Sequence, residues 1–171
     1  NSDGTTALID WNNTLPSGTP SAKITISAYN GETVILSTVN KTNGAFNLYG
    51  QTDWDIVGLT IDGNTTHGGY GIDNTTRIRF ISGEIRNIHG DCSYVAGTSN
   101  EITNSLIHGC TGDAGLPGDY GVYTQGTGHI FEGNKFYDTT AHGIHAYCGG
   151  CATTNSNMII RRNTFTNWGT T

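Results

Sequence analysis

A short block with two apolar residues five positions apart recurs along the 171 residues of this chain. Successive blocks start 24, 22, 29 and 29 residues apart, and a second short apolar segment precedes each one. The copies are Ile56–Ile61, Phe80–Ile85, Ile102–Ile107, Phe131–Phe136 and Ile160–Phe165, with Val34–Val39 as a degenerate further copy. A repeat of this period predicts a solenoid in which each repeat forms one coil.

The content of each repeat narrows the type of solenoid. About three short strands, separated by turns rich in Gly, Asn and Asp, fill a repeat and leave no room for a helix. This excludes folds with one helix per repeat, and a propeller blade needs about 40 residues. The sequence therefore predicts an all-β fold, a parallel β-helix of about six coils with inward columns of Ile, Val, Leu and Phe.

Asparagine recurs at one turn position of this pattern. Asn134 and Asn163 each occupy the third residue after the first apolar anchor of a block. A buried turn leaves backbone polar groups unpaired, and stacked side-chain amides can bond them. We expect a partial ladder at this position, because the other copies carry Leu59, Gly83 and Ser105 there.

Composition excludes several classes of protein. Charged residues are only 13% of the chain, whereas Gly, Thr and Asn are abundant, which is unlike a coiled coil or a helical bundle. The net charge is −6 and the only adjacent basic pair is Arg161-Arg162, so no nucleic-acid partner is predicted. No apolar run approaches the ~20 residues of a membrane span.

The chain divides into two parts on its sequence pattern. Residues 1–16 are expected to cap the N-terminal end of the solenoid, and residues 17–171 to form a single β-helix domain. At the C-terminal end one alternative is that Trp168 folds over the last coil as a partial plug. Otherwise that coil is open, as in a fragment or a unit that continues into a partner. Open strand edges invite pairing, and end-to-end self-association is therefore a candidate interaction.

Four cysteines and four sequons favour a secreted or cell-surface protein. Equivalent turns of neighbouring coils contain Cys92 and Cys110, which predicts a disulfide between them. A second disulfide, Cys148–Cys151, is predicted within the CGGC segment, with free thiols or a metal half-site as alternatives. The candidate glycosylation sites are Asn12, Asn40, Asn64 and Asn74, although a chain rich in Asn and Thr also produces such triplets by chance.

Two stretches carry a resemblance to a known family. The segment 17–36 is similar to the first coil of many secreted polysaccharide lyases, and Ile130–Phe136 resembles the generic repeat of these proteins. The chain, over roughly residues 17–168, thus resembles the right-handed parallel β-helix proteins of the pectate-lyase-like group. The resemblance implies a right-handed solenoid that acts on or binds polysaccharides, on a scaffold that also hosts hydrolases, epimerases, tailspikes, adhesins and structural proteins.

Two rows of outward side chains are candidates for the site. The first row flanks the upstream apolar segment, with Asp91 nearby, and supplies groups for proton transfer and sugar stacking. Its candidate catalytic residues are Tyr70, Asp73, Tyr120, Tyr123, His142 and His145. The second row follows the downstream anchor and consists of Asp62, Arg86, His108 and Tyr137. These four residues, together with Asp119 beside the first row, are the candidate substrate-binding residues. The alternative for both rows is a solvated sheet face, in which Asp62 and Arg86 form a cross-coil salt bridge.

Comparison with branches of the group gives partial matches. The motif Tyr70-Gly71-Ile72-Asp73 is similar to the start of a mannuronan epimerase motif, but Asn74-Thr75 replaces its Pro-His. The acids of the related polygalacturonases are mostly missing. Calcium is the only cofactor that the sequence leaves open, through Asp53, Asp55 and Asp62, and no other metal site is predicted.

These observations predict an extracellular β-helix that binds or processes an acidic polysaccharide in an external groove. If the protein is an enzyme, a lyase or epimerase is expected. The alternative is a non-catalytic structural or adhesive glycoprotein that assembles end to end into fibres.

Overall fold

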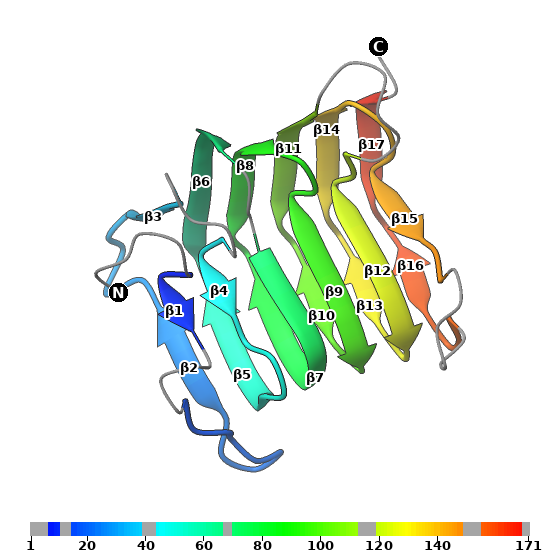
Figure 1. The fold of residues 1–171 in the computed structure, drawn as a ribbon. Coiled ribbons are helices and arrows are strands. Elements are labelled where there is room, and N and C mark those ends of the chain that lie inside the picture. The colour runs from blue at the N-terminus through cyan, green and yellow to red at the C-terminus, as the bar shows by residue number, and fades with distance from the viewer. Residues whose placement is uncertain are drawn as a thin grey trace.

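Three faces of parallel strands enclose a narrow interior in the computed structural model (Figure 1). The structure describes residues 7–10, 15–38, 44–66, 70–112, 119–148 and 155–168, and these residues contain strands but no helix. The chain passes from the first face to the second and the third, and then begins the next coil. The elements therefore stack side by side from β1–β3 at one end to β15–β17 at the other.

Each face takes one strand from each coil. The first face contains β1 (Ile9–Asp10), β4 (Phe46–Asn47), the beginning of β7 (Tyr70–Ile81), β9 (Ser93–Thr98), β12 (Val122–Thr127) and β15 (Ile144–Ala146). The second face contains β2 (Ile24–Ser27), β5 (Thr52–Val57), the end of β7, β10 (Glu101–Thr103), β13 (Ile130–Glu132) and β16 (Ile159–Arg161). The third face is a six-stranded sheet of β3 (Val34–Ser37), β6 (Leu59–Thr66), β8 (Glu84–His89), β11 (Leu106–Thr111), β14 (Lys135–Thr139) and β17 (Thr164–Trp168).

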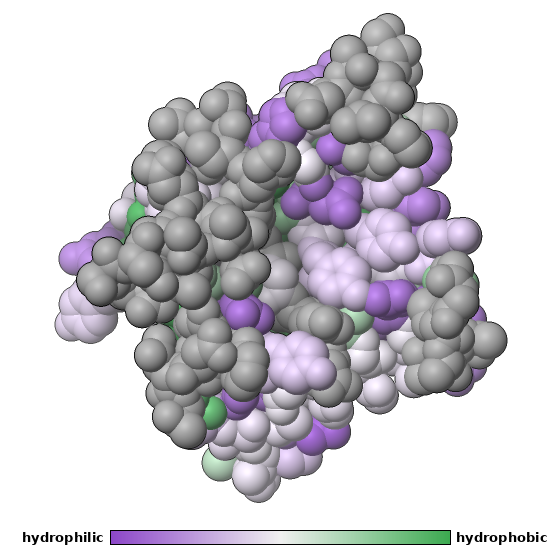
Figure 2. Space-filling model, in the orientation of Figure 1, coloured by the Kyte–Doolittle hydropathy of each residue, from purple (hydrophilic) through white to green (hydrophobic). Residues whose placement is uncertain are grey.

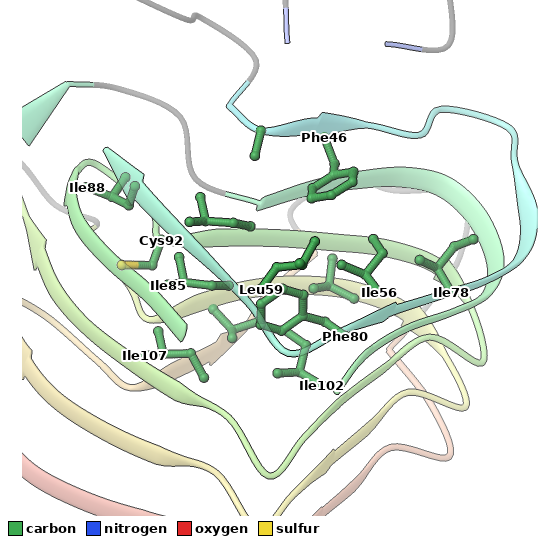
Figure 3. Packing of buried hydrophobic residues seen from close by; sticks show 14 of the residues in the cluster. Phe46, Ile56, Leu59, Ile78, Phe80, Ile85, Ile88, Cys92, Ile102 and Ile107 are labelled. Carbon is green, nitrogen blue, oxygen red and sulfur yellow. The ribbon is translucent and has the colours of Figure 1, made fainter. Parts of the chain in front are cut away.

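The predicted apolar columns are present on two faces. On the second face the register joins Ile56, Phe80, Ile102, Phe131 and Ile160. On the third face it joins Ile61, Ile85, Ile107, Phe136 and Phe165. Figure 3 shows part of both columns meeting in the interior, with Phe46 of β4 facing them from the first face; the column residues labelled there are Ile56, Phe80, Ile102, Ile85 and Ile107. The fold class is therefore confirmed.

The first coil and the number of coils differ from the expectation. The residue that precedes Ile56 in its column is Ile26, whereas Val34 lies on the third face and pairs with Leu59. Val34–Val39 is thus not a copy of the block that begins at Ile56. About four coils have strands of three or more residues on every face, because β1 and β4 contain only two residues each.

Residues with positive φ form the corners of the coils. One such residue lies between the second and third faces in each of five coils: Gly58, Ser82, Asn104, Gly133 and Arg162. The left-handed region reverses the chain direction within a single residue, and Gly, Asn and Asp enter it at least cost. The stacked corners explain why turn residues recur with the same period as the apolar anchors.

The predicted asparagine ladder fills the interior beside this corner. The side chain of Asn134 accepts a hydrogen bond from Ser105 N at 2.9 Å and donates one to Ile102 O at 2.8 Å. Asn163 accepts from Asn134 N at 2.8 Å, and the Ser105 hydroxyl accepts from Gly83 N at 3.2 Å. The ladder thus pairs buried backbone groups that the strands leave unbonded.

A disulfide joins two neighbouring coils as the sequence predicts. Cys92 and Cys110 are bonded, with their Cα atoms 5.3 Å apart, and both are buried beside Ile85 and Ile107. Cys148 is also disulfide-bonded, and its predicted partner Cys151 lies outside the described residues.

The last coil exposes part of its apolar column. Ile160 and Phe165, which follow fully buried residues in the preceding coils, are 48% and 40% exposed. The part of the chain that the structure describes contains no helix long and apolar enough to cross a bilayer.

Candidate functional site

An aromatic row crosses the outside of the first face. Strand register places Tyr94 of β9 beside Tyr123 of β12, and Tyr123 beside His145 of β15. The rings of Tyr94 and Tyr123 are stacked with centroids 5.8 Å apart, and Tyr123 meets His145 edge to face at 5.4 Å. Because outward residues of neighbouring parallel strands lie about 4.8 Å apart, the three side chains form one continuous strip.

A second group of rings extends this row toward the corner that precedes β12. Tyr120 lies 4.2 Å from His145 and 5.7 Å from His142, measured between ring centroids. The rings of Tyr147 and His145 are stacked, with their centroids 5.5 Å apart. Figure 2 looks onto this face, where the described surface is mostly white to purple with only small green patches. The strip is therefore aromatic but hydrophilic, as tyrosine and histidine rings are.

Two carboxyl groups lie at the base of an open cavity in this strip. The cavity has a volume of about 440 Å³ and is lined by Gly90, Asp91, Asp119, Tyr120, Tyr123, His145 and Tyr147. Asp91 accepts a hydrogen bond from Tyr120 N at 3.0 Å, which fixes the carboxyl against the start of the next coil. Asp119 is only 7% exposed. We call this arrangement the first-face pocket.

The surroundings of the first-face pocket raise the pKa of one of its acids. Burial raises the pKa of Asp91 and the charge of Asp119 raises it further, while the hydrogen bond from Tyr120 N and the charge of His145 oppose these effects. Burial, together with the charge of Asp91, also raises the pKa of the Tyr120 hydroxyl. A carboxyl that holds its proton more tightly than usual is suited to donate it to a bound ligand.

The structure brings together four of the six predicted catalytic residues. Tyr120, Tyr123 and His145 line the first-face pocket, and His142 is exposed at its edge. The predicted ligand-binding residue Asp119 lies in the same pocket. The backbones of Tyr70 and Asp73 belong to β7, but their side chains lie outside the described part of the structure.

By sequence pattern, the first-face segments 70–73, 93–96, 120–123 and 142–145 align with one another residue by residue. The structure confirms this alignment between β7 and β9 and between β12 and β15. Between β9 and β12 the alignment is displaced by two residues, because it matches Val95 with Val122 whereas the structure pairs Val95 with Thr124. Ala96, expected beside Tyr123 in the outward row, is instead buried, and Tyr94 takes that place. Tyr94 and Tyr147 were therefore missed, although matching ring to ring along the face would have found Tyr94.

The second predicted row lies on the third face, away from this pocket. Asp62, Arg86, His108 and Tyr137 follow one another in register, as the sequence predicts. Arg86 contacts Asp62 at 2.9 Å and Glu84 at 3.1 Å, and His108 bonds Glu84 at 2.9 Å while it stacks on Tyr137 at 4.3 Å. The row is a closed network of cross-coil contacts, which is the arrangement expected of a solvated sheet face.

The acids considered for calcium are engaged with basic residues. Asp53 pairs with Arg77 at 2.8 Å, Asp55 pairs with Arg79, and Asp62 pairs with Arg86. Hydrogen bonds from Arg77 and Arg79 lower the pKa values of Asp53 and Asp55. Among the described residues no three His, Cys, Asp or Glu side chains gather in a way that could hold a metal ion. These acids therefore do not fit a calcium site.

The predicted glycosylation sites lie only partly within the described chain. Asn12 and Asn40 fall outside the described residues. Asn64 and Asn74 belong to strands β6 and β7, but their side chains are not among those described.

Comparison with known families adds the handedness of the coil. A family model described as the right handed beta helix region matches residues 94–171, a little under half of the chain. This protein is a right-handed parallel β-helix. The matched part of the β-helix contains β9 to β17, and with them most of the first-face pocket. No curated protein and no solved structure matches the chain.

The fold by itself limits function to a broad class. A β-helix of this kind is a carbohydrate-active or structural protein. Which of these the chain is depends on its own side chains, and the first-face pocket is where acid, phenol and imidazole groups meet.

Proposed function

We propose that this β-helix binds an extracellular polysaccharide along its first face and processes it in the first-face pocket. The observation that carries the proposal is the joining of an aromatic strip to two carboxyl groups within one open cavity. Tyrosine faces stack on the apolar faces of sugar rings, while their hydroxyls remain free to hydrogen bond. The strip crosses three coils, so a chain of sugars laid across the coils has several rings to rest on.

The chemistry supported by these groups is proton transfer at a bound sugar. His145 is a candidate to remove a proton, and Asp91 and Tyr120, whose pKa values are raised, are candidates to supply one. Removal and return of a proton at one carbon is the work of an epimerase, whereas removal followed by loss of the leaving group is that of a lyase. The proposal includes both an epimerase and a lyase reaction.

An acidic polymer is the substrate class predicted from the sequence, with Arg86 as the partner of a uronate carboxylate. Arg86 is on the third face and is already held by Asp62 and Glu84. An acidic chain bound there would have to compete with both acids, so the first face is the better candidate for binding a saccharide of any charge.

Affinity electrophoresis of the folded protein through gels containing polygalacturonate, a mannuronate polymer or neutral polysaccharides tests the proposal. At least one polymer should retard the wild type. Tyr123→Ala should weaken that interaction by about tenfold, which corresponds to about 1.4 kcal/mol. Tyr29→Ala is the matched control, because Tyr29 is exposed in a turn of the first coil. The assignment would be refuted if Tyr123→Ala and Tyr29→Ala were retarded equally, or if no polymer retarded the wild type.

Cleavage and epimerisation are separate measurements. Ultraviolet absorbance of unsaturated uronate detects a lyase, and proton exchange at the sugar carbon, followed by NMR in D2O, detects an epimerase. His145→Ala should abolish either signal while binding persists. A signal that survives this change would remove His145 from the chemistry.

Self-association through the last coil is a second candidate function. The observation that favours it is the exposure of Ile160 and Phe165, which line a cavity of about 380 Å³ with His142, Gly143 and Ile144. Sedimentation velocity at rising concentration tests it: the wild type should form oligomers, and Phe165→Ser should not. A wild type that stays monomeric throughout would refute this candidate.

A further inference from the structure

The proton-transfer groups of the first-face pocket all reach a ligand from one side. Asp91 lies in the corner before β9, Tyr120 lies in the corner before β12, and His145 belongs to β15. The ring of His145 lies 4.2 Å from that of Tyr120, measured between centroids, and the charge of His145 acts on the carboxyl group of Asp91. A sugar that rests on this surface therefore turns one face of its ring toward a base and two acids together.

The way a sugar stacks on tyrosine decides which of its hydrogens point into the pocket. Aromatic rings take the apolar face of a sugar, which carries C–H groups rather than hydroxyls. In a uronate the acidic hydrogen is the one on the carbon that bears the carboxyl group. In β-linked D-mannuronate and D-glucuronate this hydrogen projects from the apolar face. Stacking of that face on Tyr123 therefore directs the acidic hydrogen toward the wall that contains His145.

The leaving group of the same two sugars lies on that side as well. In D-mannuronate and D-glucuronate the glycosidic oxygen on the neighbouring carbon is on the same side of the ring as the acidic hydrogen. In L-guluronate and D-galacturonate the two groups lie on opposite sides. One wall that holds both a base and an acid can thus serve both groups in the first two sugars, and only one of the groups in the last two.

We infer that the first-face pocket catalyses a syn elimination and that its substrates are chains of β-linked D-mannuronate or D-glucuronate. This inference rests on the proposed function, since it selects one of the two reactions assigned to the pocket and the uronates that fit it. An epimerase must return the proton to the opposite face of the carbon. The described lining of the pocket instead places its proton donors on the same side as His145.

Every proton and electron pair has a place in this step. The unprotonated imidazole of His145 takes the acidic hydrogen as a proton through Nε2, because its Nδ1 is buried. The electron pair of that C–H bond forms the double bond of the unsaturated uronate, and the bond from the neighbouring carbon to the glycosidic oxygen breaks. The leaving oxygen takes the proton of the Asp91 carboxyl group. Exchange with water then removes the proton from His145 and returns one to Asp91.

Tyrosine hydroxyls complete the arrangement. The uronate carboxylate must be stabilised while the neighbouring C–H bond breaks, because negative charge develops on it. Tyr123 and Tyr147 line the same cavity, and their hydroxyls can donate hydrogen bonds to this carboxylate. Such charge-assisted hydrogen bonds are stronger than those between neutral groups.

A matched pair of oligomers tests the inference. Mannuronate and guluronate oligomers differ only in the configuration of the carbon that bears the carboxyl group. Ultraviolet absorbance should report unsaturated uronate from the mannuronate oligomer about 100-fold faster than from the guluronate oligomer. A glucuronate oligomer should also be cleaved, and a galacturonate oligomer should not. NMR of the mannuronate reaction should show cleavage without the formation of guluronate.

Asp91→Asn tests the assignment of the acid. This variant should lower kcat on the mannuronate oligomer by about 100-fold or more, while a mannuronate gel still retards it. Its Oδ1 can still accept the hydrogen bond from Tyr120 N, so the fold should be kept. Glu32→Gln is the matched control, because Glu32 is exposed in a turn of the first coil, and it should keep full activity.

The outcomes separate this inference from the proposed function. Cleavage of guluronate or galacturonate oligomers as fast as the mannuronate oligomer would overturn the inference and leave the proposed function standing. Formation of guluronate without cleavage would do the same, because the pocket would then be that of an epimerase. Full activity of Asp91→Asn would overturn the syn step as written. If no uronate is processed, the inference fails together with the catalytic part of the proposed function.

Discussion

Asn134 holds together two buried parts of the interior, and its removal should be among the more costly single changes in this protein. Asn134→Ala leaves Ser105 N and Ile102 O without the partners that they have at 2.9 and 2.8 Å. A buried polar group without a partner costs about 1–3 kcal/mol. The two together therefore predict a loss of about 2–6 kcal/mol in the free energy of unfolding.

Equilibrium urea denaturation followed by far-ultraviolet circular dichroism measures this loss. Asn134→Ser should recover part of it, because serine is the residue that this position carries one coil earlier, where Ser105 accepts a hydrogen bond from Gly83 N. Asn163→Ala is the matched control in the last coil, where its side chain is only partly buried, and it should cost less. A loss below about 0.5 kcal/mol for Asn134→Ala, or a larger loss for Asn163→Ala, would refute the reasoning.

Three further measurements test the fold. Burial lowers the pKa of His129, so the free energy of unfolding should fall as the pH drops below 6.5, the pKa of histidine in the unfolded chain, by at most about 1.4 kcal/mol per pH unit. In urea titrations between pH 7 and pH 5, His129→Asn should flatten this slope. An unchanged slope would contradict the assignment. Gly133→Ala places a methyl group at a corner residue whose φ is 70° and close to the side chain of Asn104. This change should lower the free energy of unfolding by about 1–2 kcal/mol in the same assay. A neutral result would contradict the corner geometry. Replacing Cys92 and Cys110 together by Ala should lower the free energy of unfolding by about 3 kcal/mol, because their disulfide closes a loop with a sequence separation of 18. An unchanged denaturation midpoint would contradict this prediction.

The register of two faces could be predicted because their strands carry distinctive anchors. Ile56, Phe80 and Ile102 are large apolar residues that begin blocks of constant internal spacing, and the structure pairs them as expected. Cys92 and Cys110 were predicted as a pair because both lie in the turn region after the downstream strand of adjacent coils. In every coil after the first, the corner between these faces has only one or two residues, so a repeat found in the sequence is also a repeat in space.

One join of the first face, between β9 and β12, could not be aligned in this way. Its strands are joined to the rest of the coil by segments of variable length, and inward positions alternate with outward ones along each strand. A shift of two residues keeps every inward side chain inward, so Val95 fits beside Val122 as well as beside Thr124 by pattern alone. Only the packed structure shows which pairing is adopted.

The sequence by itself determined the solenoid, its apolar columns, the asparagine ladder and the cross-coil disulfide, because these depend on residues that recur at equivalent places in successive coils. Tertiary structure decided that Tyr94 joins the aromatic strip, that the acids considered for calcium pair with arginines, and that Asp91 and Asp119 share one pocket. The physical reason is that a core is specified by periodic burial, whereas a site on the surface depends on which outward side chains neighbouring coils bring side by side.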